Sequence, residues 1–97
     1  MAKAYWIAAY HKIIDPDKLK AYASLASKAI EDNGGRFLAR GGNVTAKENG
    51  IAERTVIIEF DSYHRAISTY NSALYQQALD ALDNGAIRDI RIIEGID

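Results

Sequence analysis

The sequence predicts an α+β domain in which a four-stranded antiparallel sheet carries helices on one face. Three observations lead to this prediction: four segments have the composition of strands, two regions between them carry apolar residues at helical spacing, and these elements follow the order βαββαβ. The 97 residues form one domain, residues 1–97, with a thin core of its own.

A clear boundary separates the first predicted strand from the first predicted helix. Residues 4–12 are rich in aromatic side chains, as strands often are, and they end near Asp15-Pro16. This pair predicts a helix start, because the aspartate can cap free N–H groups and proline suits the first turn. Asn33-Gly34-Gly35 accepts left-handed backbone and ends the helix. The apolar residues at three-and-four spacing are Leu19, Tyr22, Ala23, Ala26, Ala29 and Ile30.

Residues 36–41 and 54–60 are the next two predicted strands, the second rich in β-branched side chains. Their connection is short and carries the turn dipeptide Asn49-Gly50. The two strands are therefore expected to pair as an antiparallel hairpin.

A second helical region is predicted to begin at Asp61-Ser62, to be interrupted at Asn71-Ser72, and to end at Asn84-Gly85. Residues 87–96 form the last predicted strand. The resulting order is that of the split βαβ unit, or ferredoxin-like fold.

Three of the predicted strands are apolar on both faces. A sheet face that no helix covers normally alternates with polar residues, so an apolar one needs another cover. A second copy of the chain, packed sheet against sheet about a two-fold axis, is the economical solution, and an unrelated partner protein is the alternative. The sequence therefore predicts a homodimer through the sheet face. The residues concerned are Tyr5 to Tyr10, Val56 to Ile58, Phe60, Ile90, Ile92 and Ile93.

The composition argues against several classes of function. Twelve basic and thirteen acidic residues give a net charge of −1, whereas nucleic-acid-binding proteins usually show a basic excess. No cysteine is available for disulfides or thiolate metal sites. No apolar stretch approaches the roughly 20 residues that span a bilayer, and the first apolar run is too short for a signal peptide. We therefore expect a cytoplasmic protein without nucleic-acid or membrane partners.

Arg40 and Glu59 are the leading candidates for catalytic residues, because each is predicted to lie within a strand among apolar neighbours. Charged groups at such positions must be paired or line a wet cavity. They either form a cross-strand or interface ion pair, or line a cavity between sheet and helices. In that cavity Arg40 would orient an anionic or carbonyl group, and Glu59 would act as acid or base. Arg36, Arg54 and Arg88 could replace Arg40, but they stand at strand starts, where exposure costs less.

His11 is a third catalytic candidate, because it lies at the end of the first strand, where a site could open. A surface histidine is the alternative, and His64, in the first turn of a capped helix, is expected to face solvent. The sequence shows no phosphate-binding glycine loop, nucleophile elbow or set of metal ligands at a suitable spacing. No cofactor or metal is therefore predicted, and a haem ligand has only weak support.

Tyr10, Tyr70 and Tyr75 are the candidate ligand-binding residues. Tyr70 and Tyr75 flank the predicted helix break and face the sheet, and Tyr10 lies on the first strand. Core packing with a satisfied hydroxyl is the alternative explanation for each of them.

Residues 34–42 (GGRFLARGG), 54–60 (RTVIIEF) and 70–75 (YNSALY) carry a resemblance to a known family. Together with the aromatic first strand and residues 88–95, they resemble the bacterial family called domain of unknown function 1330. The resemblance implies a dimeric α/β barrel. That superfamily includes cofactor-free monooxygenases, muconolactone-isomerase-like proteins, haem-degrading enzymes and dye-decolorising peroxidases.

The resemblance brings no agreed activity, and a fold does not fix a function. Two hypotheses therefore follow from the sequence. The chain binds or transforms a small aromatic or carbonyl-containing metabolite in a pocket between sheet and helices, or it is a non-catalytic dimeric module. Whether it is an enzyme stays open at this point.

Overall fold

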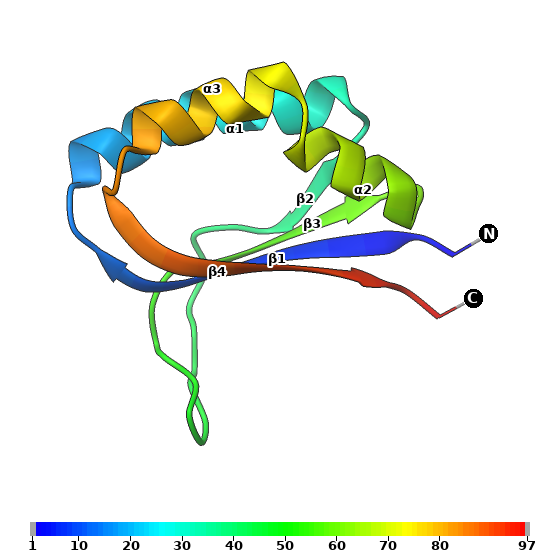
Figure 1. Ribbon diagram of the computed structural model, residues 1–97. Coiled ribbons are helices and arrows are strands. Elements are labelled where there is room, and N and C mark those ends of the chain that lie inside the picture. The colour runs from blue at the N-terminus through cyan, green and yellow to red at the C-terminus, as the bar shows by residue number, and fades with distance from the viewer. Residues whose placement is uncertain (1, 97) are drawn as a thin grey trace.

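A single sheet with helices over one face makes up the computed structural model, which describes residues 2–96 (Figure 1). The sheet is antiparallel, and its strand order is β2-β3-β1-β4. This order and the chain topology confirm the predicted α+β, ferredoxin-like fold. The strands are β1 (Ala4–Ile13), β2 (Arg36–Ala39), β3 (Thr55–Phe60) and β4 (Ala86–Glu94), and the helices are α1 (Pro16–Asp32), α2 (Tyr63–Tyr70) and α3 (Ala73–Leu82).

The helix starts form as the sequence predicts. The Asp15 side chain accepts hydrogen bonds from the backbone N–H groups of Asp17 and Lys18, at 3.0 and 3.2 Å, and Pro16 opens α1. Ser62 caps α2 in the same way, and Ser72 caps α3. The predicted interruption therefore divides the second helical region into two separate helices.

The connection between β2 and β3 differs from the prediction. Residues 40–54 form a long arm that projects from the side of the sheet away from the helices (Figure 1), so the expected short connection is wrong. The two strands still pair antiparallel, with Phe37 opposite Ile58. β2 ends at Ala39, and two residues later Gly41 adopts a left-handed backbone conformation with φ 77° that takes the chain away from the strand direction.

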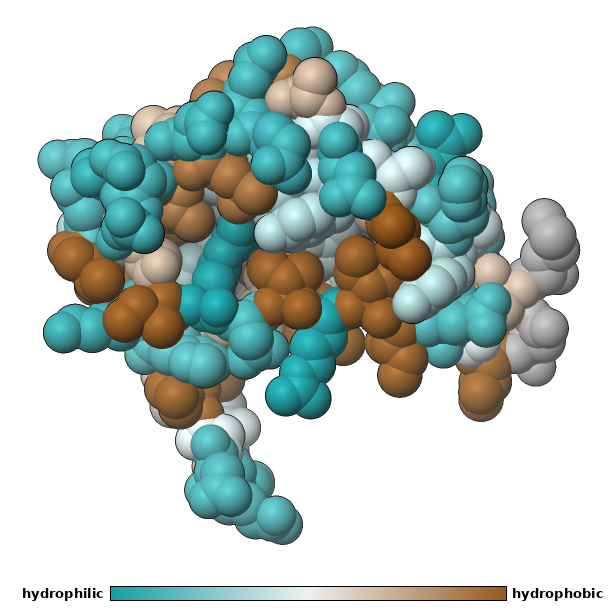
Figure 2. All heavy atoms as spheres, viewed as in Figure 1, coloured by the Kyte–Doolittle hydropathy of each residue, from teal (hydrophilic) through white to brown (hydrophobic). Residues whose placement is uncertain are grey.

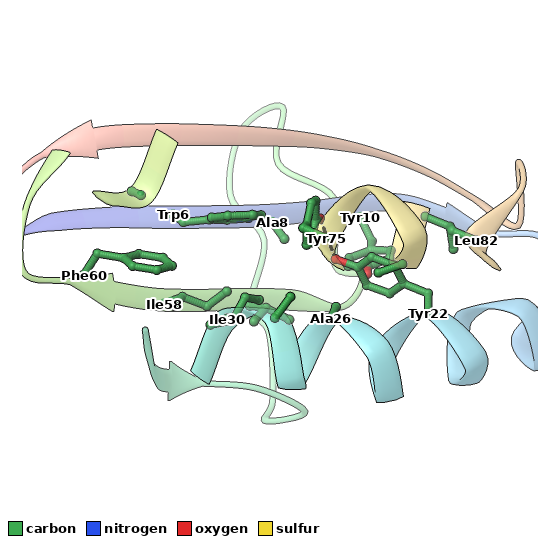
Figure 3. Packing of buried hydrophobic residues seen from close by; sticks show 14 of the residues in the cluster. Trp6, Ala8, Tyr10, Tyr22, Ala26, Ile30, Ile58, Phe60, Tyr75 and Leu82 are labelled. Carbon is green, nitrogen blue, oxygen red and sulfur yellow. Dashed lines mark hydrogen bonds between the residues drawn. The ribbon is translucent and has the colours of Figure 1, made fainter. Parts of the chain in front are cut away.

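Aromatic side chains dominate the core between the sheet and the helices (Figure 3). Trp6 packs against Phe60, with ring centroids 5.9 Å apart, and edge-on against Tyr75 at 4.9 Å. Burial of such large rings supplies much of the stability of a small domain, at roughly 25 cal/mol per Å² of apolar surface. On β1, the helix-facing side chains are Ala4, Trp6, Ala8 and Tyr10, all buried.

The opposite face of the sheet is uncovered in the single chain. Tyr5 and Ile7 are half-buried there, whereas Leu38 and Ile93 are 55% and 57% exposed. Apolar side chains are visible along this lower side of the sheet, interspersed with polar ones (Figure 2). The sheet is therefore partly apolar on its uncovered face, and we call this surface the open face.

Across residues 2–96, no helix has the length and apolar character that crossing a membrane requires. The cytoplasmic location stays a prediction.

Candidate functional site

Four polar side chains meet inside the core, at the end of the sheet where α1 begins. Tyr22 of α1 and Tyr75 of α3 bring their hydroxyl oxygens to 2.7 Å from each other. Arg88 of β4 donates from Nη1 to Tyr22 Oη at 2.9 Å and to Tyr10 Oη at 3.2 Å, and from Nη2 to Tyr75 Oη at 3.1 Å. The labelled rings of Tyr10, Tyr22 and Tyr75 are close together in Figure 3. We call these four residues the Tyr-Arg cluster.

Strand alternation places Arg88 in this cluster. Arg88 lies opposite Tyr10 in the register of β4 and β1, just as Ile90 lies opposite Ala8. Paired residues of neighbouring strands project from the same face of a sheet. Because Tyr10 points toward the helices, Arg88 does so too, and its guanidinium group is drawn into the core.

Burial fixes the protonation of the cluster. Desolvation raises the pKa of Tyr22 and of Tyr75, which favours the neutral phenol in both. Burial by itself lowers the pKa of Arg88, but the tyrosine oxygens more than offset this effect, and the guanidinium stays charged. The cluster therefore presents one cation and neutral hydroxyls, which suit binding and orientation better than proton abstraction.

A small cavity adjoins the cluster, between α1 and the strands. Its volume is about 30 Å³, enough for roughly one or two water molecules. Trp6 and Phe37 contribute aromatic walls, whereas Arg40, Arg54 and Arg88 contribute charge. The cavity therefore combines apolar walls with three guanidinium groups.

Arg40 reaches across one side of this cavity. Its guanidinium carbon lies 4.0 Å from the centroid of the Phe37 ring, and Nη1 donates to Ser27 Oγ of α1 at 3.2 Å. Arg40 thus links the end of β2 to α1, although the residue itself is exposed.

Arg54 enters the cavity from the other end of the arm. Its Nε is buried and has no hydrogen-bond partner within the described part of the chain. The guanidinium carbon lies 5.8 Å from the centroid of the Tyr10 ring. A buried N–H group without a partner is costly, and so it marks a place where an acceptor would be favourable.

A family model described as "Domain of unknown function (DUF1330)" matches residues 3–96. The chain belongs to this family. The match confirms the resemblance seen in the sequence, over nearly the whole chain. Among proteins of curated function, none matches this DUF1330 chain.

Solved structures similar to this DUF1330 protein share its fold at low sequence identity. A protein of unknown function from Rhodopseudomonas palustris is 14% identical, with a TM-score of 0.72 over 96% of this chain and 80% of that one. A dimeric ferredoxin-like protein of unknown function from Thermobifida fusca is 14% identical, with a TM-score of 0.59 over 96% and 91%. SnoaB, a cofactor-independent oxygenase from Streptomyces nogalater, is 8% identical, with a TM-score of 0.62 over 100% and 96%. At these identities the likeness shows the fold alone.

Arg40 and Glu59 do not form the expected pair. Glu59 lies on the open face, where its Oε1 is 3.0 Å from Arg36 Nη2 and its Oε2 accepts a hydrogen bond from Tyr5 Oη at 3.1 Å. The two side chains lie apart because Glu59 alternates with the helix-facing side chains of β3, whereas Arg40 lies beyond the end of β2. Glu59 forms its cross-strand ion pair with Arg36 instead, and a catalytic role for Arg40 or Glu59 stays a prediction. The hydrogen bond from Arg36 holds the pKa of Glu59 below its usual range.

His11 also lies away from the cavity. It sits at an irregularity in the pairing of β1 with β4, and its Nε2 is 2.8 Å from Asp89 Oδ2 on the surface. The contact with His11 lowers the pKa of Asp89. His64 is exposed, as expected. In the described range, 2–96, no group of three or more His, Asp or Glu side chains is placed to hold a metal ion.

The three candidate tyrosines have different surroundings. Tyr10 lines the cavity, whereas Tyr75 does not line it but accepts a hydrogen bond from Arg88, which does. Tyr70 packs against Trp6, with centroids 5.5 Å apart, and contributes no wall to the cavity. A role for any of them in ligand binding stays a prediction.

Sequence reasoning set Arg54 and Arg88 aside because both stand near strand starts. Strand alternation was a usable signal, since Arg88, Ile90 and Ile92 stand two residues apart and therefore share one face of β4. Arg54 had the same kind of signal, because it stands two residues before Val56 and alternation puts it on the face of Val56 and Ile58.

Proposed function

We propose that this DUF1330 protein binds a small aromatic or carbonyl-containing metabolite in the cavity between α1 and the sheet. One observation carries the proposal: a half-buried Arg88, fixed by three tyrosine hydroxyls, lines a cavity with aromatic walls. Apolar pockets with a few convergent polar groups are the usual form of small-molecule sites.

The cavity must open to admit such a molecule, because it now holds only roughly one or two waters. Arg40 is the side chain whose displacement opens it most cheaply. It is exposed, and it is held by one hydrogen bond to Ser27 and by its contact with Phe37. A hydrogen bond of this kind contributes only about 1 kcal/mol. We therefore place the entrance between Phe37 of β2 and Ser27 of α1.

The lining favours binding over acid–base chemistry. It offers guanidinium groups and neutral hydroxyls, and Glu59, the acid–base candidate of the sequence, lies on the other side of the sheet. The Streptomyces nogalater oxygenase, which needs no cofactor, supports a small-molecule site on this fold by analogy. The proposal is therefore one of binding and orientation.

Mapping with neutral probes tests the proposal. We expect benzaldehyde and benzamide to shift the backbone amide resonances of Tyr10, Ser27 and Arg40 in nitrogen-15 NMR spectra. The side chains of Ile7 and Ile57 point to the opposite face of the sheet, so the amides of these two residues serve as the internal control. Shifts that centre on Ile7 and Ile57, or no shifts up to the solubility of both probes, would contradict the proposal.

We also propose that two copies of the chain pair through their open faces. Leu38 and Ile93 are each more than half exposed on this face in the single chain. The same face carries both signs of charge, in the Arg36–Glu59 and His11–Asp89 pairs, so two copies related by a two-fold axis can complement each other. The dimeric Thermobifida fusca protein supports this arrangement by analogy of fold. In such a dimer the charged residues of the open face would stabilise the interface between the two copies. The alternative hypothesis, a non-catalytic dimeric module, gives these residues the same role.

A further inference from the structure

We infer that the ligand of this cavity is a small aromatic carboxylate, whose carboxylate group is bound by Arg54 beside Arg88. The inference rests on the proposed binding function, and it specifies the chemical class of the bound molecule.

The charged side chains that line the cavity are all positive. Arg40, Arg54 and Arg88 line it, and none of them makes an ion pair within 4.0 Å in the described residues. Glu53 is next to Arg54 in the chain, but its carboxylate accepts a hydrogen bond from the Arg54 backbone N–H at 2.9 Å. Arg40 is exposed, but Arg54 and Arg88 are partly buried, and cations removed from water are costly unless an anion compensates them. A bound anion would supply the missing counter-charge.

Arg54 and Arg88 differ in which of their N–H groups already have hydrogen-bond partners. Arg88 uses both Nη atoms on tyrosine hydroxyls, so it contributes charge but its Nη groups are already engaged. Arg54 has a buried Nε–H without an acceptor. A carboxylate can accept two parallel hydrogen bonds from the Nε and Nη groups of one guanidinium, which is the geometry that favours arginine at carboxylate sites.

Arg54 and Arg88 both lie beside the ring of Tyr10. The guanidinium carbons of Arg54 and Arg88 lie 5.8 and 5.4 Å from the centroid of its ring. An anion at the end of the cavity that Tyr10 borders is therefore within reach of both cations. The other walls are mostly apolar, and two of them, Trp6 and Phe37, are flat aromatic rings that favour an aromatic ring as the rest of the ligand.

Trp6 provides a direct readout, because it is the single tryptophan of the chain and lines the cavity. Benzoate and benzamide have nearly the same shape and differ in charge, so titration of each against Trp6 fluorescence isolates the effect of the carboxylate. We expect benzoate to bind about tenfold more tightly than benzamide, or better, as for a hydrogen bond to a charged group.

Arg54→Gln tests the assigned residue, and Arg65→Gln is its matched control, because it removes the same charge from an exposed position of α2. We expect Arg54→Gln to lose the preference for benzoate and to keep benzamide binding, whereas Arg65→Gln keeps both. Arg54→Lys retains the charge but lacks the planar fork, so it should also weaken benzoate binding. If Arg54→Gln fails to fold, weaker benzoate binding by Arg54→Lys tests the inference in its place.

The outcomes separate the two proposals. Equal binding of benzoate and benzamide, or a preference for benzoate that survives both changes at Arg54, overturns the inference and leaves the binding site standing. No response of Trp6 to either compound contradicts the cavity as a binding site and the inference with it.

Discussion

The hydroxyl oxygens of Tyr22 and Tyr75 lie 2.7 Å apart, where α1 and α3 run side by side over the sheet. Arg88 donates a hydrogen bond to each of them, so this contact ties both helices to β4. The core therefore has a polar centre whose partners come from three different elements. Networks of this kind lose more than one interaction when a member is removed.

Tyr75→Phe should destabilise the protein by about 1–3 kcal/mol, because it leaves Arg88 and Tyr22 each without one buried hydrogen-bond partner. Tyr63→Phe is the control, since Tyr63 is 44% exposed on α2. Urea unfolding at a fixed protein concentration measures both changes. Equal stability of the two variants would show that the cluster does not hold the helices on the sheet.

Gly35→Ala should destabilise the fold by about 1–3 kcal/mol through overpacking. A Cβ at Gly35 would lie 2.5 Å from Ile30 Cγ2 and 2.9 Å from Phe60 Cε1, inside the core. Gly42→Ala is the matched control, because its Cβ meets nothing within 4 Å. Thermal unfolding followed by circular dichroism compares them, and a Gly35→Ala protein as stable as the control would contradict this packing.

The Arg36–Glu59 contact predicts a specific dependence of stability on pH. The pKa of Glu59 is lowered in the folded protein, so its contribution is present above the ordinary pKa of 4.5 and is lost as the pH falls through the folded value. We expect the wild type to lose stability relative to Glu59→Gln as the pH falls below about 4.5. Glu31→Gln alters an exposed carboxylate of α1 and should keep the wild-type profile. Identical profiles for wild type and Glu59→Gln would refute the role given to this contact.

The open face predicts a dimer that one substitution can disrupt. Ile93→Lys places a charge on that face, whereas Ile67→Lys places the same charge on α2, where Ile67 is 36% exposed. Sedimentation velocity should give twice the mass of the chain for wild type and Ile67→Lys, and a shift toward the monomer for Ile93→Lys. A monomeric wild type, or a fully dimeric Ile93→Lys, counts against the proposed interface.

Local signals in the sequence were sufficient for most of the fold. The Asp15-Pro16 start of α1 and the Asn71-Ser72 break are encoded by side chains that act on adjacent backbone groups. The sequence did not predict the long arm, because the Asn49-Gly50 dipeptide marks a turn but does not show how far that turn lies from the ends of the two strands.

The candidate site was harder to predict, because it depends on which face of the sheet each side chain occupies. Arg40 and Glu59 are close in the predicted hairpin, yet the end of β2 and the alternation of β3 separate them. A shift of one residue exchanges the faces of a strand. The Tyr-Arg cluster joins the first two elements of the chain, β1 and α1, to the last two, α3 and β4, and no local sequence pattern predicts a contact between the two ends of the chain.

A crystal structure of the protein grown with benzoate is the most direct test of the account. We predict electron density for benzoate between α1 and the sheet, with its carboxylate against Arg54 Nε, its ring beside Trp6, and Arg40 displaced from Ser27. Density for benzoate only on the open face, or an unchanged cavity in crystals saturated with the compound, would contradict the central claim that this cavity is the functional site.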